Sequence, residues 1–187
     1  TEKKSGAPAI NKLANASLVA VMARKTDKAK DYAKRHNVPK WYTDVDELIN
    51  DPDVNAVYIA TPPDVHLEYA AKVIKAGKPV YIEKPMARNF KECEEINRLG
   101  SEAGVPVFVA YYRRTLPYFL KLKELVGQKV IGDIRCVNIT LHWQPYDEEV
   151  GENPQPRWRV FPEISGGGHF HDLASHQFDI LEFLFGE

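Results

Sequence analysis

Short runs of apolar residues recur through the first part of the chain, with longer amphipathic stretches between them. The runs are rich in β-branched and aromatic residues, as is typical of strands buried on both faces. They occupy residues 18–22, 54–60, 80–82 and 107–110. The intervening stretches have helical spacing and lie at residues 28–36, 44–49, 65–76 and 90–103. This alternation predicts a doubly wound α/β unit built on a parallel sheet.

Local end signals support several of these helices. Asp44 precedes one helix and is suited to cap its N-terminus. Gly77 and Gly104 follow two others, at the position where a left-handed residue commonly ends a helix. Residues 1–15 are also expected to be helical.

The pattern changes after the last of these strands. An amphipathic helix is expected at residues 118–126, and alternation over residues 134–143 predicts a half-exposed antiparallel strand. A loop rich in proline and acidic residues follows, and a last helix is predicted at residues 170–185. We therefore expect two domains, of which residues 1–114 form the first. Residues 115–187 are expected to begin an α+β domain with a mainly antiparallel open sheet.

Composition and charge argue against several functional classes. The 187 residues carry a formal net charge of −1 without a basic stripe, so no nucleic-acid partner is expected. The apolar runs are too short to cross a bilayer, so no membrane partner is expected either. Cys93 and Cys136 form neither a disulfide framework nor a metal-ligand spacing, and a reducing cytoplasm is the expected location.

A charged pair follows the strand at residues 80–82. Glu83 and Lys84 precede Pro85, which cannot continue a strand, so the chain must turn there. Open α/β sheets bind ligands at the carboxyl ends of their strands, and a partly desolvated lysine at such a place can exchange protons with a substrate. The alternative is a surface lysine that pairs with its glutamate neighbour.

Asp172 and His176 form a second candidate pair, on the last predicted helix. Residues four apart share one helix face, and a carboxylate beside an imidazole can build a proton-transfer site. The alternative is an aspartate favoured by the helix dipole together with a core histidine. His169 and His171 lie close by, but no second group of ligands completes a metal site, so no metal is expected.

The order of several motifs resembles the Gfo/Idh/MocA oxidoreductases, which include glucose–fructose oxidoreductase and inositol dehydrogenase. The resemblance covers essentially the whole chain. It rests on residues 60–66 (Ala-Thr-Pro-Pro-Asp-Val-His), residues 77–86 around Lys84, the glycines 166–168, and residues 172–176. It implies a Rossmann domain that binds NAD(H) or NADP(H), and a second domain that forms the substrate site and often an oligomer contact.

The resemblance also implies roles for individual residues. Lys84 is expected to bond the reacting substrate oxygen and to lie near the nicotinamide ribose, with Glu83 orienting it or contacting that ribose. Asp172 and His176 are expected to line the substrate pocket, with His176 as the proton carrier. Further cofactor contacts, along the nicotinamide half, are expected from Thr61, Pro62 and His66, and further substrate contacts from Trp158 and Arg159. Tyr112 and Arg114 lie at the domain junction and are expected to face the substrate pocket from there.

The turn after residues 18–22 bears on the choice of cofactor. NAD-binding units usually place an acidic residue at the end of this strand, whereas NADP-binding units place an arginine nearby. Here Ala23 occupies the acidic position and Arg24 follows it. A guanidinium can grip the added phosphate through two hydrogen bonds. We therefore predict NADP as the preferred cofactor and NAD as the alternative, while a solvated basic turn would explain the same residues without a ligand.

One expected element does not occur in this sequence. A dinucleotide-binding unit opens with a strand that runs into Gly-x-Gly-x-x-Gly, and only Gly6 lies near the start of this chain. We therefore expect the sequence to be an internal piece of a longer protein, trimmed at both ends, with the first strand of the sheet and the glycines that contact pyrophosphate outside it.

Together these features predict an NAD(P)-dependent oxidoreductase. It would transfer a hydride between nicotinamide and a sugar, polyol or related cyclic hydroxy or keto compound, in a homo-oligomer (a dimer or tetramer) of the full-length chain. Two alternatives stay open: a non-catalytic nucleotide-sensing regulator of the same fold, and an NAD-dependent glycosidase of the same family.

Overall fold

The computed structural model describes residues 7–142, 144 and 157–186. Five short strands carry the first part of the chain: β1 (Ala20–Met22), β2 (Lys40–Tyr42), β3 (Val57–Ile59), β4 (Val80–Ile82) and β5 (Val107–Val109). The helices of this part are α1 (Ala7–Ile10), α2 (Thr26–His36), α3 (Val45–Asn50), the 3₁₀ turn η2 (Pro63–Val65), α4 (His66–Lys75) and α5 (Phe90–Ala103). Strands and helices alternate, as the hydrophobic pattern predicts.

The strands form two parallel sheets. β1 pairs with β2, and β3, β4 and β5 form a three-stranded sheet in that order. Val80 lies opposite Val57 on one side and Val107 on the other. Among the described residues β1 and β3 do not pair with each other. The described strands thus form two separate parallel sheets.

The core lies between the sheets and the helices α3, α4 and α5. Val80 and Ile82 are buried on one face of β4, whereas Tyr81 between them is exposed on the other face. Val73 of α4 and Ile96 of α5 are fully buried in the same core. Alternation along a strand and helical spacing along α4 and α5 thus bring the apolar side chains to one interior.

Local signals set several element ends where the sequence predicts them. β4 and α5 have the predicted bounds, and Gly104 ends α5 in the left-handed conformation with φ of 65°. The carboxylate of Asp44 accepts hydrogen bonds from the backbone N–H groups of Asp46 (2.6 Å) and Glu47 (3.3 Å). This contact confirms the predicted cap of α3.

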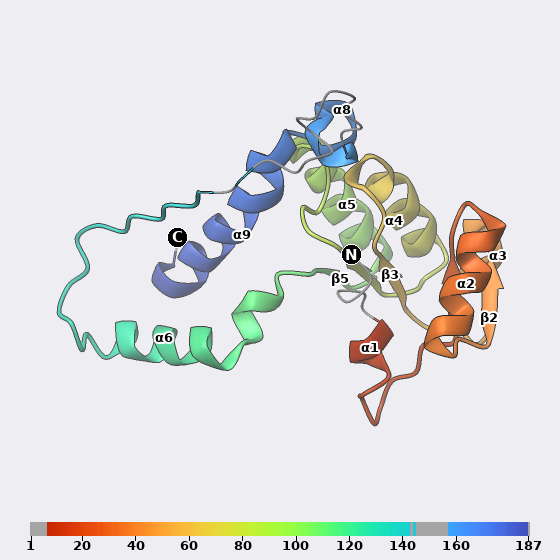
Figure 1. The fold of residues 1–187 in the computed structure, drawn as a ribbon, viewed down its shortest axis with the longest axis horizontal. Helices are drawn as coiled ribbons and strands as arrows, with labels where there is room; N and C mark the ends of the chain where they lie inside the picture. The colour runs from red at the N-terminus through yellow and green to blue at the C-terminus, as the bar shows by residue number, and fades with distance from the viewer. Residues whose placement is uncertain (1–6, 143, 145–156, 187) are drawn as a thin grey trace.

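The second part of the chain is mostly helical where it is described. It contains η3 (Tyr112–Thr115), α6 (Pro117–Gly127), η4 (Trp158–Val160), α8 (Pro162–Ser165) and α9 (Gly168–Phe185). In Figure 1, α6 and the segment after it extend away from the sheets, whereas α9 begins beside α8 near α4 and α5. None of the described helices is long and apolar enough to cross a bilayer.

The strand predicted at residues 134–143 does not form in residues 134–142, which are exposed and have no regular secondary structure. A strand needs a neighbour for its backbone hydrogen bonds, and no described segment pairs with this one. The alternation of apolar and polar residues is therefore present, but the described residues include no strand that pairs with it. Residue 143 and the predicted loop at residues 145–156 lie outside the described residues, as do residues 1–6 of the first predicted helix.

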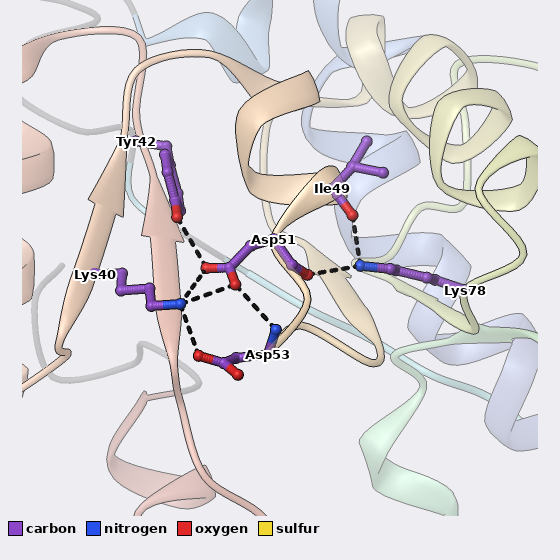
Figure 2. Close-up of polar contacts among 6 residues, drawn as sticks. All are labelled: Lys40, Tyr42, Ile49, Asp51, Asp53 and Lys78. Atoms are coloured by element: carbon purple, nitrogen blue, oxygen red, sulfur yellow. Dashed lines mark hydrogen bonds and ion pairs between the residues drawn. The ribbon is translucent and has the colours of Figure 1, made fainter.

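A buried carboxylate joins β2 to the loop after α3 (Figure 2). The Asp51 side chain is only 1% exposed and accepts hydrogen bonds from the Lys40 ammonium (2.9 Å) and the Tyr42 hydroxyl (2.8 Å). Lys40 also bonds Asp53, at 2.7 Å. The Lys78 ammonium donates to the backbone carbonyls of Ile49 and Asp51 at the end of α3. This cluster lies where β2 begins, at the edge of the sheet opposite the carboxyl ends of the strands.

We expect Asp51→Asn to lower the melting temperature by several degrees at pH 7. The hydrogen bond from Lys40, with those from the Asp53 backbone and Tyr42, lowers the pKa of Asp51 from 3.8 to about 2. Because the folded pKa is depressed, this stabilisation is present above pH 3.8 and is lost as the pH falls toward 2. Thermal melts from pH 7 to 2 should therefore show a weaker acid dependence in the variant.

The matched control is Asp31→Asn, which removes an exposed pair with Arg35 on α2. Such surface pairs contribute little, so its melting temperature should stay within about one degree of the wild type. An equal loss in both variants would contradict the assigned role of Asp51.

Candidate active site

The turn after β4 places Lys84 at the carboxyl edge of the three-stranded sheet. The Glu83 backbone N–H donates to the carbonyl of Ile59, which extends the β3–β4 pairing by one residue before the chain turns. The Lys84 side chain is 15% exposed. Its ammonium donates to the Asp172 carboxylate at 2.5 Å and to the Asp172 carbonyl at 2.9 Å. Two candidate residues 88 positions apart in sequence therefore meet.

Asp172 has a cation on each of its carboxylate oxygens. Lys84 bonds Oδ1, and the Arg159 guanidinium bonds Oδ2 at 3.2 Å. Burial alone would raise the pKa of Asp172, but the hydrogen bond and charge of Lys84, together with Arg159, hold that pKa below its ordinary value. The carboxylate is thus ionised at neutral pH and fixes the position of the Lys84 ammonium.

His176 lies one turn further along α9 and is buried, with 6% of the residue exposed. Its ring meets Tyr112 edge-on with 5.5 Å between ring centres, and Tyr111 with 6.1 Å. Burial, followed by the positive charges of Lys84 and Arg113, lowers the pKa of His176 to about 4. Its Nδ1 atom is buried without a hydrogen-bond partner among the described residues. The imidazole is therefore uncharged at neutral pH, one helical turn from the Asp172 carboxylate that bonds Lys84.

The start of α9 is held tightly against the loop that carries Lys84. Gly166 has φ of 87°, and a Cβ atom there would overlap the backbone carbonyl of Arg88. The Arg88 guanidinium donates to the carbonyl of Glu163, at 3.1 Å. The His171 ring lies 3.3 Å from the carbonyl of Ala87. A glycine with left-handed backbone is required here because no side chain fits between the two segments.

A further ion pair ties α9 to the end of the first part of the chain. Arg114 of η3 bonds the carboxylate of Asp179 at 2.7 Å and reaches Glu182 at 3.3 Å. Asp179 is 6% exposed, and burial raises its pKa although Arg114 opposes the shift. These residues line an open hollow of about 670 Å³ together with Tyr81, Tyr111, Tyr112 and Ser175.

Glu83 is fixed by its neighbours. Its carboxylate accepts hydrogen bonds from the Tyr58 hydroxyl on β3 and from the Lys84 backbone N–H. The Tyr58 ring also packs against Tyr81, with 5.3 Å between ring centres. The Lys84 ammonium instead bonds Asp172, and the predicted contact of Glu83 with the nicotinamide ribose stays a prediction.

The other residues expected at the cofactor lie near the carboxyl ends of two strands. Thr61 and Pro62 follow β3 and are half-buried, and the Thr61 hydroxyl is a buried group without a partner among the described residues. Arg24 is exposed two residues after β1. His66 is completely buried, and its ring faces backbone carbonyls rather than an open surface.

The residues expected at the substrate are divided between two places. Arg159 joins the Lys84–Asp172 pair, and its guanidinium stacks 4.4 Å from the Trp158 ring centre. Tyr112 and Arg114 instead line the hollow beside His176. Within the described residues no group of three or more histidine, cysteine or acidic side chains could hold a metal ion.

Sequence reasoning missed three residues that support this site: Tyr111 against His176, Tyr58 on Glu83, and Asp179 on Arg114. Only Asp179 had a usable signal. It lies seven residues after Asp172 and three after His176, which places all three on one face of a helix. Tyr58 lies in a strand, where an aromatic residue is ordinary, and Tyr111 follows one directly, so nothing in the sequence distinguishes them.

Comparison with known proteins identifies the family of this chain. Residues 2–111 match a family model described as "Oxidoreductase family, NAD-binding Rossmann fold", and residues 119–187 match the GFO/IDH/MocA C-terminal domain. "Oxidoreductase P35" of Formosa agariphila is 47% identical over 186 residues, which cover 100% of this chain and 57% of that protein.

Two solved structures share the fold at 28% identity and a TM-score of 0.80 each. One is a levoglucosan dehydrogenase in complex with NADH and levoglucosan, matched over 97% of this chain and 49% of that one. The other is a putative NADPH-dependent oxidoreductase from Desulfitobacterium hafniense, matched over 96% and 51%. The chain thus spans about half the length of the proteins it matches. By its two domain matches and the Rossmann-type arrangement of its strands, it belongs to the Gfo/Idh/MocA oxidoreductase family.

Proposed function

We propose that this chain provides the cofactor edge and the proton-transfer residues of an NAD(P)-dependent dehydrogenase or reductase. When bound, the nicotinamide would accept a hydride from, or return it to, a carbon of a sugar, polyol or related cyclic hydroxy or keto compound. The observation that carries this proposal is the convergence of Lys84, Asp172 and His176 at the carboxyl edge of a parallel sheet.

The three side chains divide the chemistry between them. The Lys84 ammonium, fixed by Asp172, can donate a hydrogen bond to the reacting oxygen and stabilise negative charge on it. The uncharged imidazole of His176 can accept the proton that a hydroxyl group loses as its carbon is oxidised. The reverse reaction returns the same proton to the carbonyl oxygen. Asp172 acts on Lys84 rather than on His176, since both of its oxygens bond cations.

The class of substrate is supported by the relatives and by the character of the site. A levoglucosan dehydrogenase with the same fold was solved with NADH and levoglucosan. In this chain, hydroxyl, guanidinium and carboxylate groups line the hollow beside His176 together with tyrosine rings. Polar groups beside aromatic rings suit a compact ligand with several hydroxyl groups.

The direct test uses the full-length protein and a panel of cyclic polyols, aldoses and ketoses with NADP and NAD. We expect a change in absorbance at the reduced-nicotinamide band that depends on both cofactor and substrate. A protein that binds NADPH but turns over no member of the panel in either direction would contradict the proposal. Release of free sugar from a glycoside without net cofactor change would point to a glycosidase.

We further propose NADP as the preferred cofactor, on the basis of Arg24. This exposed guanidinium stands two residues after β1, and Ala23 occupies the position of the acidic residue that would repel a phosphate. The relatives leave both cofactors open, since one solved structure holds NADH and another is described as NADPH-dependent.

We expect Arg24→Ala to weaken NADPH binding about tenfold or more and to leave NADH binding within about twofold. One charge-assisted contact contributes about 1.5–3 kcal/mol, which corresponds to a factor of about 10–100. Fluorescence titration of the full-length protein with each dinucleotide measures both constants. Lys28→Ala, at an exposed position on α2, serves as the control and should change neither. Equal losses for the two cofactors in the Arg24 variant would contradict the assignment.

A further inference from the structure

His66 is the first residue of α4 and has no exposed surface. The ring nitrogens of a fully buried histidine lose their contacts with water, so they need hydrogen-bond partners within the protein. Among the described residues, the partners of the His66 ring are backbone oxygens. The ring therefore contacts the backbone of its neighbours rather than their side chains.

The two ring nitrogens face two different loops. Nε2 lies 2.8 Å from the carbonyl of Thr61, directly after β3. Nδ1 lies 3.2 Å from the carbonyls of both Pro85 and Met86, in the turn after β4. A carbonyl oxygen can only accept a hydrogen bond, so the contacts to the two loops are hydrogen bonds together only in the ring form that carries hydrogen on both nitrogens. The imidazole thus forms a bridge between the ends of neighbouring strands.

Both bridged loops carry residues of the proposed site. Thr61 belongs to the loop expected along the nicotinamide half of the cofactor, and Pro85 follows Lys84 directly. The Lys84 ammonium bonds the Asp172 carboxylate at 2.5 Å, and Lys84 directly precedes Pro85, whose carbonyl faces the His66 ring. Backbone hydrogen bonds hold β3 to β4 only as far as Glu83. Beyond that residue, the His66 side chain contacts both loops.

We propose that His66 is a positioning residue for the transfer reaction. By bonding the Thr61 loop and the Pro85–Met86 turn at once, it keeps the cofactor edge and the Lys84 ammonium at a fixed separation. Displacement of a reacting group by about 1 Å can cost a factor of about 100 in rate. This inference rests on the proposed function, and it assigns His66 an indirect role in place of a direct contact with the dinucleotide.

The test compares His66→Phe with His66→Gln in the full-length protein. Phenylalanine fills the same space with a ring but has no ring N–H, so the hydrogen bonds to both loops are lost. Glutamine has one amide nitrogen and can restore a bond to one loop. We expect kcat to fall about 100-fold in His66→Phe and about 10-fold in His66→Gln. The dissociation constant for the cofactor should stay within about threefold in both.

Two controls separate positioning from stability. Ile96→Val weakens the fully buried core of α5 without touching either loop. It should lower the melting temperature and leave kcat unchanged when the assay is run below the transition. His36→Gln makes the same chemical change at the end of α2 and should also leave kcat unchanged. If His66→Phe keeps kcat within threefold of the wild type, or if Ile96→Val loses as much activity as His66→Phe, the proposal is overturned.

A readout without turnover distinguishes this proposal from the proposed function. We expect hydrogen exchange to become faster at the amides of Thr61, Met86 and Ala87 in His66→Phe but not in Ile96→Val. Amides in the middle of α4 should keep their protection. If the wild type turns over no substrate, the proposed function fails and exchange alone decides the role of His66. Unchanged exchange at the three loop amides would then overturn the bridge.

Discussion

Replacement of Lys84 by methionine is expected to lower kcat by about 10²–10³, the loss typical of removing one donor that stabilises charge on the reacting oxygen. Methionine keeps an unbranched apolar stem of similar length, so the loss would report the ammonium itself. Without it, no cation bonds the Oδ1 oxygen of Asp172, and the substrate oxygen loses its donor. The dissociation constant for the cofactor should change by less than about threefold, because most of the dinucleotide lies away from this group.

The control for this variant is Lys72→Met. Lys72 lies on α4 and pairs with exposed acidic residues on the surface. It undergoes the same substitution, and kcat should stay within about twofold of the wild type. Steady-state kinetics together with titration of the cofactor separate the two effects. A Lys84→Met enzyme that keeps more than about a third of wild-type turnover would remove Lys84 from the mechanism.

Replacement of His176 by glutamine is expected to produce the second large loss, about 10²–10³ in kcat for oxidation of the alcohol. Glutamine retains polarity and similar bulk but cannot accept and release a proton near neutral pH. The pKa of about 4 keeps the wild-type imidazole uncharged and able to accept a proton at neutral pH. The wild-type oxidation rate should therefore hold from neutral pH downward and fall only as the pH approaches 4.

The pH profile provides the sharper test of His176. Because the lowered pKa favours the neutral ring, the protonated and inactive form accumulates only below about pH 4. The glutamine variant should show a low rate without that acid limb. His142→Gln, at an exposed position, should keep both the rate and the profile of the wild type. An unchanged acid limb in the His176 variant would show that another group titrates there.

The site was predicted from the sequence as separate residues, and the structure supplied their connections. Asp172 and His176 were paired by their spacing of four on a helix, yet the carboxylate of Asp172 bonds Lys84 and Arg159. Helical spacing fixes which face a residue is on but not which loop packs against that face. The bond between Arg114 and Asp179 joins residues 65 positions apart, a separation that no local pattern reports.

Residues 134–142 illustrate the same limit for the fold. Their alternation is clear, yet no strand forms, because a strand depends on a neighbour that the local sequence does not contain. By contrast, α5 and β4 have the predicted bounds. Gly104 marks the end of the helix α5. The charged pair before Pro85 marks the end of β4.

The sequence by itself therefore determined the order of strands and helices and the family, and it pointed to Lys84, Asp172 and His176 as candidates. These follow from signals that lie within a few residues of one another or in a fixed order of motifs. Only the tertiary structure decided that Asp172 fixes Lys84, that His176 is buried and uncharged, and that His66 bridges two loops. Each of these depends on contacts between segments distant in sequence, and burial and charge act through space rather than along the chain.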